Sequence, residues 1–398
     1  MKKYFRFILL WILALYLLVP STAFCRDSIK VGIILPGTGE KAEFGEIEKK
    51  SFEMALEEIN AAGGVNGRTL EFLYEDDTGR PEAARSAAKK LITNDNVVML
   101  GGGYSSSETF AIAGVAQQNR IPFLVNTGSD NKITEMKWDF VFRLNQPVSD
   151  YPKALESFMT EVVKPQSVAI LYENTNFGSS GSKEFQRSCE KLKLKVVMNA
   201  GYQSGGVDFK PLLVRVKQAN PDVIYMISYL MDASLLMKQS MELKLTPKIF
   251  VGGGAGFTLP EFGENAGKAG NLVYSATLWY QTLPYPGARE YYDKFVQRYK
   301  METEYHGAEG YSAAYVIADT LKRARSLTPN DVRESLSKTD IMTIFGPVKF
   351  LSYEKMNNQN KLPTYLVQWI DGKLELVWPK EVANKSYVYP IDWEKVWK

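Results

Sequence analysis

Strand and helix signals alternate along most of the chain, and this alternation constrains the fold more than any other feature. Residues 29–35 form a nearly continuous apolar run, which predicts a buried strand. Phe52, Ala55 and Ile59 then recur at helical spacing, and Gly63 ends that helix. Because an order of strand, helix, strand, helix is typical of a parallel sheet covered by helices on both faces, the sequence predicts an α/β fold.

The same rhythm starts again after Asp150, so the chain divides into two similar units. Strands are expected at residues 168–172, 223–227 and 249–251, with helices between them. A chain of 398 residues is also too long for one compact core and suits two domains. We therefore predict two Rossmann-like lobes with parallel central sheets. Ligands of such sheets bind outside the carboxyl ends of the strands, which places the expected site in the cleft between the lobes.

The first 23 residues have the pattern of a secretory signal peptide. A positively charged start precedes an uncharged apolar run over residues 7–19, and small residues follow up to Ala23. Cleavage is expected after Ala23, which gives an exported, periplasmic protein. A membrane anchor is the alternative, although the run is short for a span of about 20 residues.

The chain has two cysteines, Cys25 and Cys189. Cys25 raises the alternative of a lipid anchor, but bulky Phe24 stands where a lipoprotein signal needs a small residue. One or two cysteines cannot form a disulfide framework, so burial of a core must stabilise the exported protein.

The composition excludes several classes of function. The net charge is +3, so neither nucleic acid nor an anionic membrane surface is an expected partner. His306 is the only histidine, it is expected in a polar connection, and no Gly-x-Ser-x-Gly motif accompanies it. One histidine and scattered cysteines leave no common zinc arrangement. We therefore expect a protein that is not an enzyme and has no cofactor or metal.

Two further patterns are too weak to indicate a site. The glycine-rich segment 252–256 lacks the Gly-x-Gly-x-x-Gly frame and the acidic residue of a dinucleotide site. Asp76 and Asp77 suggest a pair of carboxylates or a metal site, but the side chains of neighbouring residues on an extended segment point to opposite sides.

The strongest local signal is the segment 101–108, Gly-Gly-Gly-Tyr-Ser-Ser-Ser-Glu, which follows a strand and opens a helix. Glycines let a backbone approach a ligand closely, and the free N–H groups of a first helical turn attract anions. Ser105 could therefore help to hold a carboxylate; a plain helix cap after a tight turn is the alternative.

A matching element follows the next strand at residues 126–130, Asn-Thr-Gly-Ser-Asp. Because adjacent parallel strands end at the same edge of a sheet, Ser129 is expected beside Ser105. Taken alone, this segment could equally be an ordinary loop.

Taken together, these segments and others along the chain resemble those of the periplasmic leucine/isoleucine/valine-binding proteins of ABC transporters. The order and spacing of short matching segments hold from about residue 28 to about residue 370. These segments are 29–32, 61–67, 74–77 with Pro81, the Ser105 run, 127–129, 176–178, 208–209, 221–225, 311–315 and 346–347.

The resemblance implies a type I periplasmic-binding fold with three crossovers between the lobes. Lobe one would comprise residues 28–147 and 277–352, and lobe two residues 148–276 and 353–398. It also implies a monomeric solute-binding protein that closes around an amino acid or related small carboxylate and delivers it to the permease of an importer. A free-standing sensor and a cytoplasmic regulator of the same fold are the alternatives, and the predicted signal peptide argues against the second.

Family roles transfer to individual positions of this chain. Ser105 and Ser129 would hold the ligand carboxylate, and the carbonyl of Thr127 would accept from an ammonium. The resemblance also implies pocket positions for several aromatic residues, for which a place in the core is the alternative. They are Tyr104, Tyr229, Tyr311, Phe44 and Phe177.

One position departs from the family pattern. Gly253 stands where the branched-chain amino-acid binders have the glutamate that pairs with the ligand ammonium. Because a buried ammonium without a partner is costly, either another acid substitutes or the ligand lacks an α-ammonium. Asp232 and Glu309 are the candidate acids, and a solvated surface position is the alternative for both. We therefore hypothesise that the preferred ligand is not a standard branched-chain amino acid.

Overall fold

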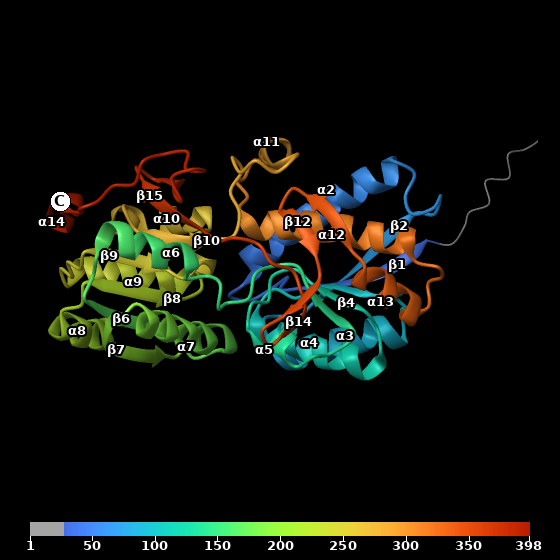
Figure 1. Ribbon diagram of the computed structural model, residues 1–398, viewed down its shortest axis with the longest axis horizontal. Helices are drawn as coiled ribbons and strands as arrows, with labels where there is room; N and C mark the ends of the chain where they lie inside the picture. The colour runs from blue at the N-terminus through green and yellow to red at the C-terminus, as the bar shows by residue number, and fades with distance from the viewer. Residues whose placement is uncertain (1–27) are drawn as a thin grey trace, which may run out of the picture.

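The computed structural model describes residues 28–398 and consists of two α/β lobes that lie side by side (Figure 1). Each lobe contains a seven-stranded, mostly parallel sheet flanked by helices, as the alternating sequence pattern predicts. The predicted signal peptide, its cleavage after Ala23 and the lipidation alternative at Cys25 lie outside the described residues. Between residues 28 and 398, no helix has the length and apolar character needed to cross a membrane.

The lobe-one sheet has the order β13-β14-β5-β4-β3-β1-β2. All neighbouring pairs are parallel except β13 with β14, which form an antiparallel hairpin. Its strands are β1 Ile29–Leu35, β2 Leu70–Asp76, β3 Leu100–Gly102, β4 Phe123–Val125, β5 Val141–Arg143, β13 Leu351–Tyr353 and β14 Met356–Gln359.

The lobe-two sheet has the order β16-β15-β10-β9-β8-β6-β7. Strands β6 to β10 are parallel, whereas β15 and β16 continue the sheet in the antiparallel sense. Its strands are β6 Ser167–Glu173, β7 Lys195–Tyr202, β8 Val223–Ile227, β9 Ile249–Gly252, β10 Tyr274–Thr277, β15 Tyr365–Ile370 and β16 Lys373–Trp378.

Helices cover both sheets, and their buried faces form the core with the apolar strands. Lobe one carries α2 Ala42–Ala61, α3 Pro81–Thr93, α4 Ser106–Asn119, α5 Lys132–Glu135, α11 Ala288–Tyr299, α12 Tyr305–Arg323 and α13 Pro329–Ser337, with a separate hairpin of β11 Asp340–Thr343 and β12 Gly346–Lys349. Lobe two carries α6 Lys153–Phe158, α7 Asn176–Lys191, α8 Lys210–Ala219, α9 Leu230–Glu242, α10 Pro260–Ala266 and α14 Trp393–Val396.

The chain crosses between the lobes three times, at residues 144–152, 278–287 and 360–364. The last crossing corrects the sequence prediction, which placed it after residue 352. Residues 351–359 still belong to lobe one, because β14 pairs with β5. This short hairpin is largely polar and gives no apolar strand signal, so the sequence pattern could not assign it.

The three crossings are joined to one another by hydrogen bonds. Gln146 Nε2 donates to the carbonyl of Pro363 at 2.7 Å, which joins the first crossing to the third. Thr364 Oγ1 donates to the carbonyl of Asp150 at 3.1 Å and repeats that connection. The hydroxyls of Tyr285 and Tyr365 lie 3.1 Å apart and join the second crossing to the start of β15.

Candidate functional site

The carboxyl ends of β3 and β4 meet at the cleft, as expected from the two serine-containing segments. Gly102 pairs with Val125 at the ends of the two strands. Beyond them, Ser106 Oγ accepts from the backbone N–H of Ser129 at 3.2 Å and of Asp130 at 3.0 Å. The hydroxyl of Ser106 therefore fixes the second turn against the start of α4.

Ser105 lies at the N-terminal end of α4, but its side chain does not cap that helix. Its hydroxyl donates to the carboxylate of Glu108 and accepts from Lys41 Nζ at 3.0 Å. Lys41 Nζ also lies 3.2 Å from Glu108 Oε1. Ser105 is thus part of a buried charged cluster, which the sequence prediction did not include.

Aromatic rings from both lobes meet in the cleft. Phe44 and Tyr104 of lobe one stack with their ring centroids 4.7 Å apart. Tyr229 of lobe two approaches both rings, at 6.0 Å from Phe44 and 5.9 Å from Tyr104. Phe177 of lobe two lies 5.6 Å from Tyr229. Four of the predicted pocket aromatics therefore form one cluster that spans the two lobes.

A small cavity of about 20 Å³ lies within this cluster. It has room for about one water molecule, because aromatic side chains from both lobes pack against one another at this point. Its lining residues come from both lobes and are Tyr104, Ser106, Thr127, Ser129, Tyr151, Phe177, Tyr229, Ala255, Tyr305 and His306.

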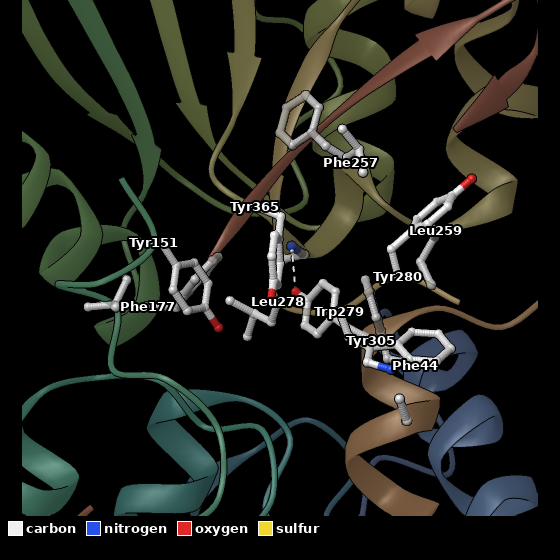
Figure 2. Packing of buried hydrophobic residues seen from close by; sticks show 14 of the residues in the cluster. Phe44, Tyr151, Phe177, Phe257, Leu259, Leu278, Trp279, Tyr280, Tyr305 and Tyr365 are labelled. Atoms are coloured by element: carbon white, nitrogen blue, oxygen red, sulfur yellow. Dashed lines mark hydrogen bonds between the residues drawn. The ribbon is translucent and has the colours of Figure 1, made fainter. Parts of the chain in front are cut away.

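Direct hydrogen bonds hold the two lobes together around this cavity. The backbone N–H of Ala255 in lobe two donates to the hydroxyl of Tyr305 in lobe one at 2.9 Å, the bond drawn as a dashed line in Figure 2. Thr258 Oγ1 donates to Glu304 Oε2 at 3.1 Å across the same boundary. Figure 2 shows Tyr151 and Phe177 next to each other, to the left of Tyr305, and all three residues line the cavity.

His306 differs from its predicted position in a polar connection. It lies in the first turn of α12, is 1% exposed and lines the small cavity. Its Nδ1 is 2.6 Å from Glu304 Oε1, and its ring packs 5.1 Å from that of Phe44. The sequence pattern missed this place because α12 begins at Tyr305, six residues before Tyr311, where the helical spacing of the sequence predicts a helix start, and because its N-cap is Glu304 and not one of the usual capping residues.

Two fully buried carboxyl groups lie behind the cavity and share one hydroxyl. Thr127 Oγ1 is 2.6 Å from Glu48 Oε1 and 2.6 Å from Glu309 Oε2. Asn126 Nδ2 donates to Thr127 Oγ1 at 2.9 Å and to Glu48 Oε2 at 2.8 Å. A hydroxyl has one proton to donate, so one of the two carboxyl groups must itself be protonated and donate to Thr127.

The electrostatics of these two carboxyl groups agree with that proton count. Burial raises the pKa of Glu48 to about 8, and burial also raises the pKa of Glu309 well above its usual value. Glu309 is therefore not the solvated surface charge that the sequence left open.

The carbonyl of Thr127, predicted to accept from a ligand ammonium, accepts instead from Asn145 Nδ2 at 2.5 Å.

The other residues considered for an ammonium lie away from the small cavity. At Gly253, a side chain would start 2.8 Å from the hydroxyl of Tyr225, so that tyrosine fills the space that a glutamate would need. Asp232 is 3% exposed, and both of its carboxylate oxygens accept from the backbone N–H of Gly205 at 3.2 Å. Burial raises the pKa of Asp232 to about 6.

Tyr311 is the one predicted pocket aromatic that lies outside the cluster of rings in the cleft. Its hydroxyl donates to the carboxylate of Glu58, and its ring packs 4.8 Å from Tyr291. It lines a separate groove of about 380 Å³ on lobe one, beside the β11–β12 hairpin. The turn of α12 that lines the small cavity is the earlier one, at Tyr305 and His306.

A second, larger and more polar groove of about 630 Å³ lies between the lobes at the mouth of the cleft. Lys41 and Glu108 line it, and the start of α7 borders it. There the backbone N–H of Asn176 donates to Ser107 Oγ at 3.4 Å, a further contact between the lobes.

Several site residues had no signal in the sequence. Tyr151 and Tyr305 stand in segments without glycine-rich or serine-rich turns, and Glu48 falls within the amphipathic pattern of α2. Lys41 follows the turn Pro-Gly-Thr-Gly at residues 36–39, which no prediction used. Ser106 could have been predicted, because it belongs to the serine run 105–107, of which the prediction named only Ser105.

Comparisons with known proteins agree with this architecture. A family model described as periplasmic binding protein matches residues 28–373. The Leu/Ile/Val-binding protein homolog 7 of Brucella melitensis is 26% identical over 94% of this chain and 97% of its own length.

Two solved structures share the fold. The branched-chain amino-acid transporter substrate-binding protein LivJ of Streptococcus pneumoniae, in complex with isoleucine, has a TM-score of 0.81 and 22% identity, and the match covers 89% of this chain and all of that protein. A solute-binding protein of an ABC transporter from R. palustris, in complex with benzoate, has a TM-score of 0.78 and 20% identity, with 88% and 96% coverage. Since the family model covers most of the chain, this protein belongs to the periplasmic binding proteins, a family of substrate-binding proteins.

Proposed function

We propose that this protein captures a small organic carboxylate between its lobes and delivers it to the permease of an importer. The observation that carries the proposal is the convergence of both lobes on one cavity. Ser106 and Ser129 of lobe one and Tyr229 and Phe177 of lobe two all line it. A ligand that bridges both lobes favours the closed form and so shifts the population of conformations.

The aromatic cluster in and around the cavity supports an apolar, preferably aromatic, ligand body. Phe44, Tyr104 and Tyr229 already pack against one another in offset and edge arrangements, which a further ring could join. Proteins of this fold bind isoleucine in one case and benzoate in another. The density of rings in this cleft favours the second type of ligand for this chain.

The charges around the cavity support a ligand without an α-ammonium. Gly253 offers no carboxylate, and that of Asp232 is engaged by Gly205. The raised pKa of Glu309 favours its neutral form near pH 7, and a neutral carboxyl group is a poor counter-ion for an ammonium. We therefore propose an aromatic or aliphatic carboxylate, rather than a standard branched-chain amino acid, as the preferred ligand.

Binding requires the cleft to open. A cavity of about 20 Å³ is far smaller than the several hundred Å³ typical of ligand pockets. The rings of Tyr104 and Tyr229 are the groups that a ligand would displace as the lobes separate and close again. The Tyr305 and Glu304 contacts with lobe two would then re-form over the bound molecule.

Isothermal titration calorimetry tests the ligand class. The panel pairs benzoate and 4-methylpentanoate with leucine, isoleucine and phenylalanine. We expect benzoate or 4-methylpentanoate to bind more tightly than any of the amino acids and to raise the thermal stability of the protein. Tight binding of leucine or isoleucine without binding of the two carboxylates would refute the proposed ligand class.

The remaining predictions about the mature protein form part of the same proposal. The family is exported to the periplasm, and we propose that export removes residues 1–23 and leaves a monomer. Intact mass and N-terminal sequencing of protein recovered from the periplasm should give a chain that begins at Phe24. Light scattering should give the mass of one chain.

A further inference from the structure

The carboxylate of Glu108 lies between the hydroxyl of Ser105 and the ammonium group of Lys41. Its Oε2 accepts from the hydroxyl of Ser105, and its Oε1 lies 3.2 Å from Lys41 Nζ. All three side chains are well shielded from solvent, with Glu108 2% and Lys41 12% exposed. The cluster therefore contains a hydroxyl donor and a cation that together hold one carboxylate.

Helix capping does not account for this arrangement. In a capping box, the serine side chain accepts from the backbone N–H three residues later, and the glutamate accepts from the serine N–H. The side chain of Ser105 makes no such capping bond, and its hydroxyl bonds Glu108 directly. Lys41 comes from the start of a different helix, α2, so the cluster joins two elements at the cleft.

On the basis of the function proposed above, we propose that the ligand carboxylate replaces that of Glu108 between Ser105 and Lys41. The Glu108 carboxylate then occupies the position of the ligand carboxylate when no ligand is bound, and Lys41 selects an anionic ligand. The exchange replaces one carboxylate by another, so the charge next to Lys41 is conserved. Charge-assisted hydrogen bonds of this kind are among the strongest in proteins.

The surroundings of Lys41 suit this role. Its Nζ lies 4.9 Å above the ring of Tyr229, so the cation touches lobe two as well as lobe one. The carboxyl groups of Asp77 and Glu173 also interact with Lys41 electrostatically, one from each lobe. A ligand carboxylate bound to Lys41 would thus lie next to the aromatic cluster, where its apolar body is expected.

Glu108 has a place to which it can move. It lines the polar groove of about 630 Å³ at the mouth of the cleft, together with Arg80 and the start of α7. Rotation of its side chain into this groove would hydrate the carboxylate and free Ser105 and Lys41. The exchange therefore needs only a side-chain movement once the lobes open.

Calorimetry on matched variants tests this inference with benzoate and its neutral isostere benzamide as probes. Lys41→Met should weaken benzoate binding by about tenfold or more, because a charged hydrogen-bond partner is lost, and should leave benzamide binding unchanged. Glu108→Gln should tighten benzoate binding severalfold, because the competing carboxylate is gone. Lys49→Met, an exposed lysine of the same helix, is the control and should bind both probes like the wild type.

The two variants should change benzoate affinity in opposite directions, since Lys41→Met weakens binding and Glu108→Gln tightens it. Equal benzoate affinity of Lys41→Met and wild type would overturn the role of Lys41 and leave the proposed function intact. Weaker benzoate binding by Glu108→Gln would show that Glu108 supports the ligand instead of competing with it. Wild-type protein that binds neither benzoate nor 4-methylpentanoate would overturn the proposed function and this inference together.

A second variant guards against loss of folding in Lys41→Met. Lys41→Arg keeps the cation and should retain benzoate affinity within about threefold, because a guanidinium also binds carboxylates. Thermal unfolding of each variant, measured without a probe, separates an effect on binding from an effect on folding.

Discussion

The hydroxyl of Thr127 links two carboxyl groups that water cannot reach. Glu48 and Glu309 approach it from α2 and α12, and the geometry requires a proton on one of them. Buried acids nearer the mouth of the cleft have raised pKa values too, about 7 for Asp77 and about 7 for Glu173, in both cases because of burial. The folded protein therefore retains protons that an unfolded chain releases.

We predict that the free energy of unfolding falls as the pH rises. Glu48 has a pKa of about 8 when folded and a usual value of 4.5, so the folded state binds the extra proton between these values. Its contribution is complete below pH 4.5 and is lost as the pH rises toward 8, at about 1.4 kcal/mol per pH unit for one proton. Urea unfolding at intervals from pH 5 to pH 9 measures this slope.

The variant Glu48→Gln should make that slope shallower, because glutamine has no proton to lose. Glu46→Gln, an exposed residue on the same helix, should keep the wild-type slope. A wild-type stability that rises between pH 5 and pH 8 would contradict the assignment of a protonated carboxyl group.

At the scale of single residues, the sequence predicted those that belong to a recognisable pattern. Ser129 and Phe177 follow the ends of strands, and both line the cavity. Lys41 immediately precedes α2 and Glu48 lies on it, in a segment where a charged residue is expected on a solvated face. Their burial depends on lobe two and on α12, which are remote in the sequence, so no local pattern could reveal it.

At the scale of elements, α2 and α12 cross in close contact beside the cleft. Gly45 lies in this region, where a Cβ atom would be 1.8 Å from the carbonyl oxygen of Pro36. At Gly310 of α12, a Cβ atom would be 3.0 Å from the carbonyl oxygen of Glu48 in α2. Small residues thus allow the two helices that carry Phe44, His306 and the buried carboxyl groups to approach each other and β1.

We predict that Gly45→Ala destabilises the protein by about 3 kcal/mol, since the backbone must move to accept the methyl group. Gly114→Ala is the matched control within α4, where the nearest atom to the new methyl group is a Trp138 carbon at 4.0 Å. That change should be neutral or stabilise the protein by up to about 1 kcal/mol, as alanine favours helix. Chemical denaturation compares the two variants, and equal stabilities would contradict the packing described for Gly45.

The order of elements was predictable because each strand and helix has its own apolar period. The alternation located β1, β6, β8 and β9 well, but it failed for the hairpin of β13 and β14, which is held by lobe-one neighbours and not by its own apolar residues. The glycine-rich segment 252–256 gave an ambiguous signal. In the structure it lets the end of β9 approach Tyr229, since a Cβ atom at Gly256 would be 2.3 Å from the backbone of that tyrosine.

At the scale of the whole molecule, the closed arrangement depends on a few contacts between the lobes. The hydroxyl of Tyr305 accepts from Ala255 (Figure 2). The carboxylate of Glu304 accepts from Thr258. Each is a single hydrogen bond, with a net contribution of about 1 kcal/mol. The balance between open and closed forms is therefore sensitive to single substitutions at this boundary.

We predict that Tyr305→Phe shifts the protein without ligand toward the open form. The lost hydrogen bond should lower the closed-to-open ratio by about threefold to tenfold, because the Ala255 N–H loses its acceptor. Small-angle X-ray scattering should show a larger radius of gyration for the variant. Tyr299→Phe, which removes a hydrogen bond to Lys50 within lobe one, should scatter like the wild type. An unchanged radius for Tyr305→Phe would contradict the role of this contact.

The three crossing segments determine what kind of motion this opening can be. They lie close together, and Gln146, Thr364 and Tyr285 join them to one another. A single tether would let one lobe twist and slide freely against the other, whereas three linked tethers resist torsion and leave one swing about a common axis. Ser129 and Tyr229 must then return to the same alignment after every opening, so the shape offered to a captured molecule stays constant from one cycle to the next.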